Sequence, residues 1–113
     1  MTEYTLIGIY IFQSGEIYSG SWSNNVRSGL GVTLDQESVH VGIYKDDQLG
    51  NKALALYADG SYFEGEFING SREGNGVYIW SNGDWYQGKW HAGNAMQIGT
   101  MGWGNKPNRK GQF

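Results

Sequence analysis

A repeat of about 23 residues is the feature that most constrains the fold of this chain. Residues 15–22 (GEIYSGSW) recur as residues 60–67 (GSYFEGEF) and 83–90 (GDWYQGKW), and a degenerate copy lies at 37–44 (ESVHVGIY). The glycines that anchor the four copies, Gly20, Gly42, Gly65 and Gly88, are spaced by 22, 23 and 23 residues. A fixed period of this length predicts units that pack on their neighbours in a repeat array.

The second half of each unit repeats as well. Residues 29–35 (GLGVTLD) match 74–80 (GNGVYIW), with weaker copies at 51–57 and 97–103 and a lone copy at 8–12 (GIYIF). We therefore predict an array over residues 1–105, followed by a basic tail at 106–113. The array divides into a half unit at 6–14 and four units at 15–36, 37–59, 60–82 and 83–105.

Within a unit the period is two, which indicates strands. Tyr18, Gly20 and Trp22 share one face of their segment, and the intervening residues take the other face. Turn residues separate the segments, namely Asn24-Asn25, Asp46-Asp47, Asn69-Gly70, Asp59-Gly60 and Asn82-Gly83. No segment shows helical spacing over ten residues. The prediction is an all-β fold, a single antiparallel sheet of consecutive β-hairpins with about nine strands.

Aligning the units predicts columns of rings beside columns of small residues. In the first-half strands, one column holds Tyr18, His40, Phe63 and Tyr86, and another holds Trp22, Tyr44, Phe67 and Trp90. In the facing strands, the column of small residues is Gly31, Ala53, Gly76 and Gly99. A further column there holds Phe12, Asp35, Tyr57, Trp80 and Trp103. Glycine in a strand costs about 0.5–1 kcal/mol, so this many in register imply a packing need. We expect rings to lie flat over bare backbone.

The opposite face carries aliphatic residues in the second-half strands and mostly polar residues in the first-half strands. The second unit departs from this rule with Val39, Val41 and Ile43, which predict an apolar patch in the middle of the array. Such a patch marks an interaction site if it is exposed. Curvature of the sheet could instead fold it under, and the sequence leaves both readings open.

Charge and composition restrict the partners. Residues 1–105 hold 5 basic and 11 acidic side chains, a net charge of −6, which disfavours nucleic acid. The absence of Cys excludes disulfides and thiolate metal sites. The longest apolar run, at residues 6–12, is too short to span a bilayer as a helix, and the acidic start lacks the positive region of a signal peptide. We predict a soluble protein of the cytoplasm.

Catalytic signals are weak. Glu64 and Glu66 share one strand face about 7 Å apart, a spacing that would suit paired carboxylates but fits a solvated strand face better. His40 and His91 lie about two units apart in different columns, so we expect no metal site, and His40 is expected to replace a ring in its column. The sequence predicts no enzyme, no cofactor and no metal.

The unit Tyr-x-Gly-x-Trp, a turn, and then Gly-x-Gly, at a period near 23, resembles the MORN (membrane occupation and recognition nexus) repeat. The resemblance covers residues 7–105 and is strongest at residues 60–76. It implies an elongated, curved sheet of stacked hairpins. It also implies a non-catalytic module that binds partners, dimerises or contacts lipid, in the cytoplasm or peripherally at a membrane or the cytoskeleton.

Three binding hypotheses follow. The first is a scaffold or interaction module for a protein partner, which could also form a homodimer through open sheet edges such as the apolar strand at residues 6–12. The second is an anionic-lipid surface formed by Lys106, Arg109 and Lys110, which has the weaker case because three basic residues contribute only about 3 kcal/mol. The third is a glycan or small-ligand groove lined by Trp22, Trp80, Tyr86 and Trp90. The candidate binding residues are Tyr18, Trp22, Tyr44, Phe63, Phe67, Trp80, Tyr86, Trp90, Val39, Val41 and Ile43.

Overall fold

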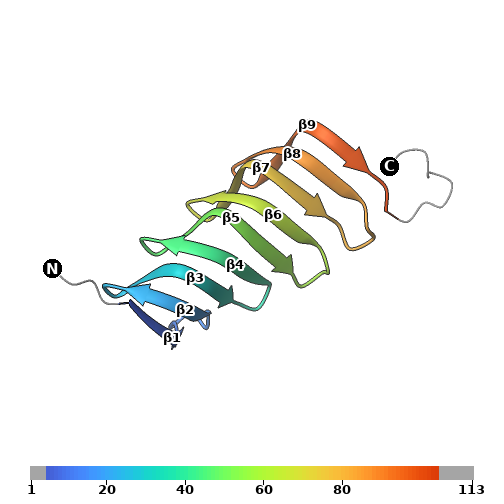
Figure 1. Cartoon of the computed structure of the whole chain (residues 1–113). Helices are drawn as coiled ribbons and strands as arrows, with labels where there is room; N and C mark the ends of the chain where they lie inside the picture. The colour runs from blue at the N-terminus through green and yellow to red at the C-terminus, as the bar shows by residue number, and fades with distance from the viewer. Residues whose placement is uncertain (1–4, 105–113) are drawn as a thin grey trace.

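The computed structural model describes residues 5–104, and every regular element in this range is a strand (Figure 1). The strands are β1 (Thr5–Ile11), β2 (Ile17–Ser23), β3 (Val26–Leu34), β4 (Ser38–Lys45), β5 (Gln48–Tyr57), β6 (Tyr62–Ile68), β7 (Ser71–Ile79), β8 (Trp85–His91) and β9 (Asn94–Gly102). They form one sheet in chain order, and each strand is antiparallel to the next. The predicted all-β meander of hairpins is confirmed.

The turns form where the turn residues predicted them. Asn24 and Asn25 have φ of 53° and 70°, and Asp46 and Asp47 have φ of 51° and 72°. Two successive positive φ values produce a tight hairpin turn whose twist matches that of the flanking strands, and Asn and Asp tolerate this conformation. Asn and Asp therefore form the turns of the first two units, and Ala92 and Gly93 likewise take positive φ values, 51° and 84°, between β8 and β9.

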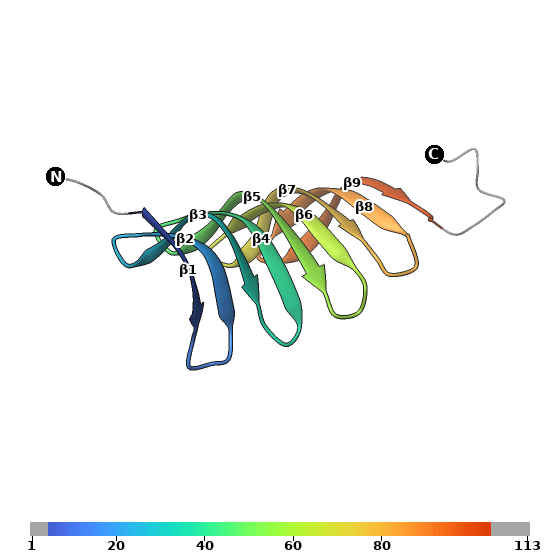
Figure 2. The ribbon, with the colours of Figure 1, turned by 60° about the horizontal axis from the view of Figure 1, so that its bottom comes forward.

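A row of small residues crosses all nine strands in register. This glycine row consists of Gly8, Gly20, Gly31, Gly42, Ala53, Gly65, Gly76, Gly88 and Gly99. Inside every unit the register then shifts just past the row, for example between Gly20 and Trp22 and between Gly88 and Trp90. Bulges of this kind bend a strand. The bends give the ribbon its curvature (Figure 2).

The rings lie on the glycine row, as predicted. A Cβ added at Gly31 would overlap the Tyr18 ring, and one added at Gly76 would overlap the Phe63 ring. Both rings are 0% exposed, although the sheet has only one layer. Bare backbone on the neighbouring strand lets the ring lie against the peptide plane, so the sheet builds a core without a second layer.

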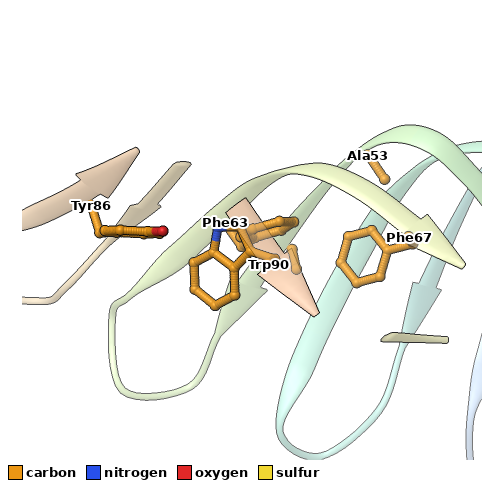
Figure 3. Close-up of a cluster of buried hydrophobic side chains, with 6 residues drawn as sticks. Ala53, Phe63, Phe67, Tyr86 and Trp90 are labelled. Carbon is orange, nitrogen blue, oxygen red and sulfur yellow. The ribbon is translucent and has the colours of Figure 1, made fainter. Parts of the chain in front are cut away.

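The core continues from ring to ring along one face, here named the aromatic face. Phe63 makes edge contacts with Phe67 and Trp90, at centroid distances of 5.4 and 5.0 Å (Figure 3). The Trp90 indole N–H also donates to the Gly76 carbonyl at 3.1 Å, which ties β8 to β7. His40 packs edge-on against Phe67 at 5.6 Å, so it does take the place of a ring.

The resulting molecule is elongated, with extents of 59 × 25 × 20 Å. Each strand contacts the strands next to it in the sequence, as expected of an array in which neighbouring units support one another. Across residues 5–104 the structure has no helix with the length and apolar character needed to cross a bilayer.

Candidate functional site

The aromatic face is the first of two surfaces to consider, and most of its rings are core. Six of the eight predicted binding aromatics are buried, namely Tyr18, Tyr44, Phe63, Phe67, Tyr86 and Trp90. Trp22 is half-buried and Trp80 is 39% exposed. The glycan groove required Tyr86 and Trp90 to present free faces. Their burial, at 3% and 5% exposure, contradicts that arrangement, because rings that cover glycine backbone cannot also stack on a sugar.

Two arginines that the sequence analysis overlooked complete this face. The Arg72 guanidinium carbon lies 4.9–5.7 Å from the ring centroids of Tyr57, Phe63, Tyr78 and Trp90. The same group donates to the Gly93 carbonyl at 2.7 Å. Cation–π attraction is strongest where the cation is partly desolvated, as it is here. Contacts of Arg72 therefore stabilise the packing of the third unit against the fourth.

Arg27 does the same at the other end of the sheet. Its guanidinium carbon lies 5.2–5.7 Å from the ring centroids of Phe12, Tyr18 and Tyr44, and its Nε donates to Asp47 at 2.8 Å. That hydrogen bond lowers the pKa of Asp47 below its ordinary value. Arg27 and Arg72 lie 45 residues apart, which is two periods, so the repeat alignment held a signal for their common role.

This use of arginine leaves few cations for an anionic partner. Residues 5–104 hold five basic and ten acidic side chains, a net charge of −5. Two of the five are Arg27 and Arg72, whose guanidinium groups lie among the rings, and the others are Lys45, Lys52 and Lys89 on separate strands. The predicted lipid-binding residues Lys106, Arg109 and Lys110 lie outside the described residues.

Acid–base and metal chemistry find no support in the described part of the chain. No group of three or more His, Cys, Asp or Glu side chains there could hold a metal ion. Glu64 is exposed, and Glu66 accepts a hydrogen bond from the Asn75 backbone N–H at 3.1 Å. Burial lowers the pKa of the His40 imidazole, which keeps it neutral inside the aromatic face.

The second surface is the opposite side of the sheet, here named the open face. A row of apolar side chains crosses it in register from β1 to β8, made of Ile11, Ile17, Leu34, Val39, Leu56, Tyr62, Ile79 and Trp85. Ile11 is 66% exposed and Leu56 is 44% exposed. The row joins the patch that the second unit predicted. Within that patch Ile43 is 55% exposed, whereas Val39 and Val41 are half-buried.

A groove of about 1300 Å³ runs along this face beside the apolar row. Val41, Leu54, Leu56 and Val77 contribute apolar groups to its lining. Its polar groups come from Asn51, Lys52, Glu64, Glu66, Asn75, Gln87 and Thr100, so the lining is mixed. The open face therefore combines exposed apolar surface with a depression that a partner can enter.

The two edges of the sheet are also exposed and apolar. β1 contains no charged residue or proline, and Ile7, Ile9 and Ile11 are 86%, 72% and 66% exposed. β9 is likewise uncharged, and its Ile98 is 64% exposed. Proteins usually protect such edges with charge, proline or a covering segment. Both edges are thus open to pairing within the part of the chain that the structure describes.

These features define a class of protein. The chain is a single-layer repeat sheet with a ring-on-glycine core, exposed apolar surfaces and, between residues 5 and 104, no cluster of His, Cys, Asp or Glu that could hold a metal. A family model for the MORN repeat matches residues 18–35, in the first unit, and residues 63–85, which run from the third unit into the start of the fourth. These two stretches are MORN repeats.

Among curated proteins, the chain is similar to Alsin from several mammals. The chain is 30% identical to rat Alsin over 76 residues, which cover 62% of the chain and 5% of the relative. It is 27% identical to mouse and human Alsin over 96 residues, which cover 79% of the chain and 6% of each relative. The chain spans about a twentieth of the length of these relatives, so the similarity concerns the repeat region alone.

Proposed function

We propose that the chain is a non-enzymatic interaction module that binds an apolar segment of a partner protein on its open face. The observation that carries the proposal is the apolar row, which crosses eight strands and leaves Ile11, Leu34 and Leu56 exposed by 66%, 39% and 44%. Exposed apolar surface of this extent is characteristic of interaction sites. The sheet backbone is already ordered, so binding would not add the cost of ordering a loop in this chain.

Charge supports a protein partner over lipid or nucleic acid. The net charge of −5 over residues 5–104 repels phosphate groups, and two of the five basic side chains are held among rings. The same charge favours a partner with basic residues beside its apolar ones, since complementary potentials speed association. Binding to anionic lipid remains the alternative proposal, and it depends on Lys106, Arg109 and Lys110.

The chemistry of the open face supports binding rather than catalysis. MORN repeats form a non-catalytic module. The exposed carboxylate of Glu64 and the hydrogen-bonded carboxylate of Glu66 provide no paired acid and base in a desolvated pocket. The chain has no cysteine, which fits a reducing compartment, and we accordingly propose a cytoplasmic module.

A matched pair of variants tests the proposal. Ile43→Glu places a charge in the exposed apolar patch, and Gln13→Glu adds the same charge at an exposed turn residue away from it. Circular dichroism verifies that both fold. Affinity capture from cell extract with quantitative mass spectrometry should recover a protein with the wild type and with Gln13→Glu, and lose it with Ile43→Glu.

Two results would refute the open face as the binding surface. One is recovery of the same proteins with Ile43→Glu as with the wild type. The other is the absence of any enriched protein together with flotation of the chain on vesicles that contain phosphatidylserine. The second result would favour the lipid alternative.

A further inference from the structure

The sheet alternates two kinds of strand, and this alternation breaks at its first edge. β2, β4, β6 and β8, here named ring strands, carry a ring two residues before the glycine of the glycine row, as in Phe63-Glu64-Gly65. The remaining strands, here named plain strands, carry the glycine or alanine that the rings cover. β3, β5 and β7 each lie between two ring strands, whereas within residues 5–104 the plain strand β1 pairs with β2 alone.

Ring strands contact the glycine row on the strands beside them. Tyr18 of β2 covers Gly31 of β3, and Phe63 of β6 covers Gly76 of β7. In the other direction, Trp90 of β8 donates to the Gly76 carbonyl of β7 at 3.1 Å. Gly76 therefore receives a covering ring from β6 and an indole N–H from β8.

Gly8 in β1 receives only one of these two contacts. The Trp22 indole N–H donates to the Gly8 carbonyl at 3.3 Å, as Trp90 does to Gly76. A Cβ built on Gly8 would meet only the Trp22 Nε1 atom, at 3.9 Å, whereas at Gly76 it would overlap the Phe63 ring. Among residues 5–104, no ring occupies the covering position above Gly8.

Side chains of β1 are more exposed than the matching side chains of β7. Residues 8–12 (GIYIF) follow the same pattern as residues 76–80 (GVYIW) in β7. Yet Tyr10 and Ile9 are 53% and 72% exposed, while their counterparts Tyr78 and Val77 are half-buried beside β6. The difference in exposure marks the place where a ring strand would lie.

We infer that the free edge of β1 binds one extended segment of a partner polypeptide that carries the sequence aromatic–x–Gly. The segment pairs antiparallel with β1, with its glycine opposite Gly8 and its ring opposite Tyr10, as Gly65 faces Gly76 and Phe63 faces Tyr78. Backbone hydrogen bonds supply affinity, and the ring position supplies specificity. The inference deepens the proposed protein-binding function but uses a different surface from the open face.

A second copy of this chain fits the position poorly. The copy's own ring strands are already paired on both sides, so among the strands that the structure describes it offers only β1 and β9. An antiparallel β1 of the copy with glycine opposite Gly8 would place a Leu6 side chain opposite Tyr10, and an antiparallel β9 would place Gln97 there. Neither strand brings a ring, so the chemistry favours a different polypeptide.

The chain itself supplies the probe for the test. A fluorescein-labelled peptide with the sequence of residues 60–68 (GSYFEGEFI) contains the β6 ring strand, and fluorescence anisotropy measures its binding to the full chain. We expect saturable binding, and binding about tenfold weaker or less when the peptide carries Phe63→Ala. Hydrogen exchange should show new protection confined to residues 5–12.

Gly8→Val in the chain provides the decisive variant. The open space above Gly8 admits the new side chain, so the variant folds, but that side chain takes the place of the incoming ring. We expect peptide affinity to fall about tenfold or more. The open-face variant Ile43→Glu should bind the peptide as the wild type does, which separates this site from the open face.

Several outcomes would overturn the inference. These are no binding of the peptide, equal affinity for the peptide that lacks the ring, equal affinity of Gly8→Val, or new protection at residues 94–102 instead of 5–12. Sedimentation that shows a homodimer dissociated by Gly8→Val would assign the edge to a second copy instead. Each of these leaves the proposal for the open face intact.

Discussion

Replacing Gly76 with alanine tests the ring-on-glycine core most directly. The added Cβ would overlap the Phe63 ring, and that ring is fully buried between Phe67 and Trp90 at centroid distances of 5.4 and 5.0 Å. The ring can move only by disturbing its neighbours. Overpacking of a well-packed core costs about 1–3 kcal/mol, and the absence of a free direction places this site at the upper end of that range.

The backbone offsets part of that loss. Alanine in a strand is more favourable than glycine by about 0.5–1 kcal/mol. The net destabilisation expected for Gly76→Ala is therefore about 2 kcal/mol. For a domain of roughly this size, 1 kcal/mol corresponds to about 4–8 °C in the midpoint of thermal unfolding, so the midpoint should fall by about 8–16 °C.

Tryptophan fluorescence is a suitable assay, because Trp90 donates to the Gly76 carbonyl and reports on the same site. Gly8→Ala is the matched control in the same glycine row, since its Cβ would have only the Trp22 Nε1 atom near it, at 3.9 Å. This control should leave stability unchanged or raise it by up to about 1 kcal/mol. If Gly76→Ala and Gly8→Ala unfold at the same temperature, the reasoning about rings on bare backbone is wrong.

A double variant checks the cause. Phe63→Leu removes the ring atoms that the new Cβ would meet, so adding Gly76→Ala to that background should cost less than it does in the wild type. We expect a coupling free energy of about 1 kcal/mol or more between the two positions. Additive effects would show that the loss comes from the backbone and not from the ring.

Two further predictions concern the aromatic face. Arg72→Met keeps the aliphatic stem but removes the guanidinium from four rings and from the Gly93 carbonyl. In urea titrations it should lower the free energy of unfolding by about 1–2 kcal/mol. The control Lys52→Met, at an exposed residue, should change the free energy of unfolding by less than about 0.5 kcal/mol. Burial holds the pKa of His40 below 6.5, so the unfolded state binds more protons once the pH falls below that value, and stability should decline from pH 7 to pH 5. His40→Phe, which retains a ring in the column, should flatten that decline, and an unchanged pH profile would exclude His40 as its cause.

Much of the fold was predictable because the signals are local and repeated. Alternation of period two indicates strands, and pairs such as Asn24-Asn25 and Asp46-Asp47 specify tight turns. Consecutive hairpins of equal length leave one register that aligns every glycine. The positions of the strands and the glycine row followed from these facts, including at Ala53, where the glycine is replaced.

The candidate site was less predictable. Tyr18, Tyr44, Phe63, Phe67, Tyr86 and Trp90 were candidates for both core and ligand surface, and the sequence does not distinguish the two roles for a ring. Burial depends on what lies above the ring, which the bulges and bends of distant strands determine. The same holds for Arg72, because its contacts come from β5, β6, β7 and β8.

The sequence by itself determined the order, spacing and register of the strands, because these depend on the alternation of side chains and on the conformations that Asn, Asp and Gly allow in turns. Only the tertiary structure decided which aromatic rings are core, which apolar side chains stay exposed on the open face, and that Gly8 lacks a covering ring from residues 5–104. The physical reason is that exposure is a property of neighbours in space. Strand curvature and the end of the array set those neighbours, and neither is encoded in any single unit.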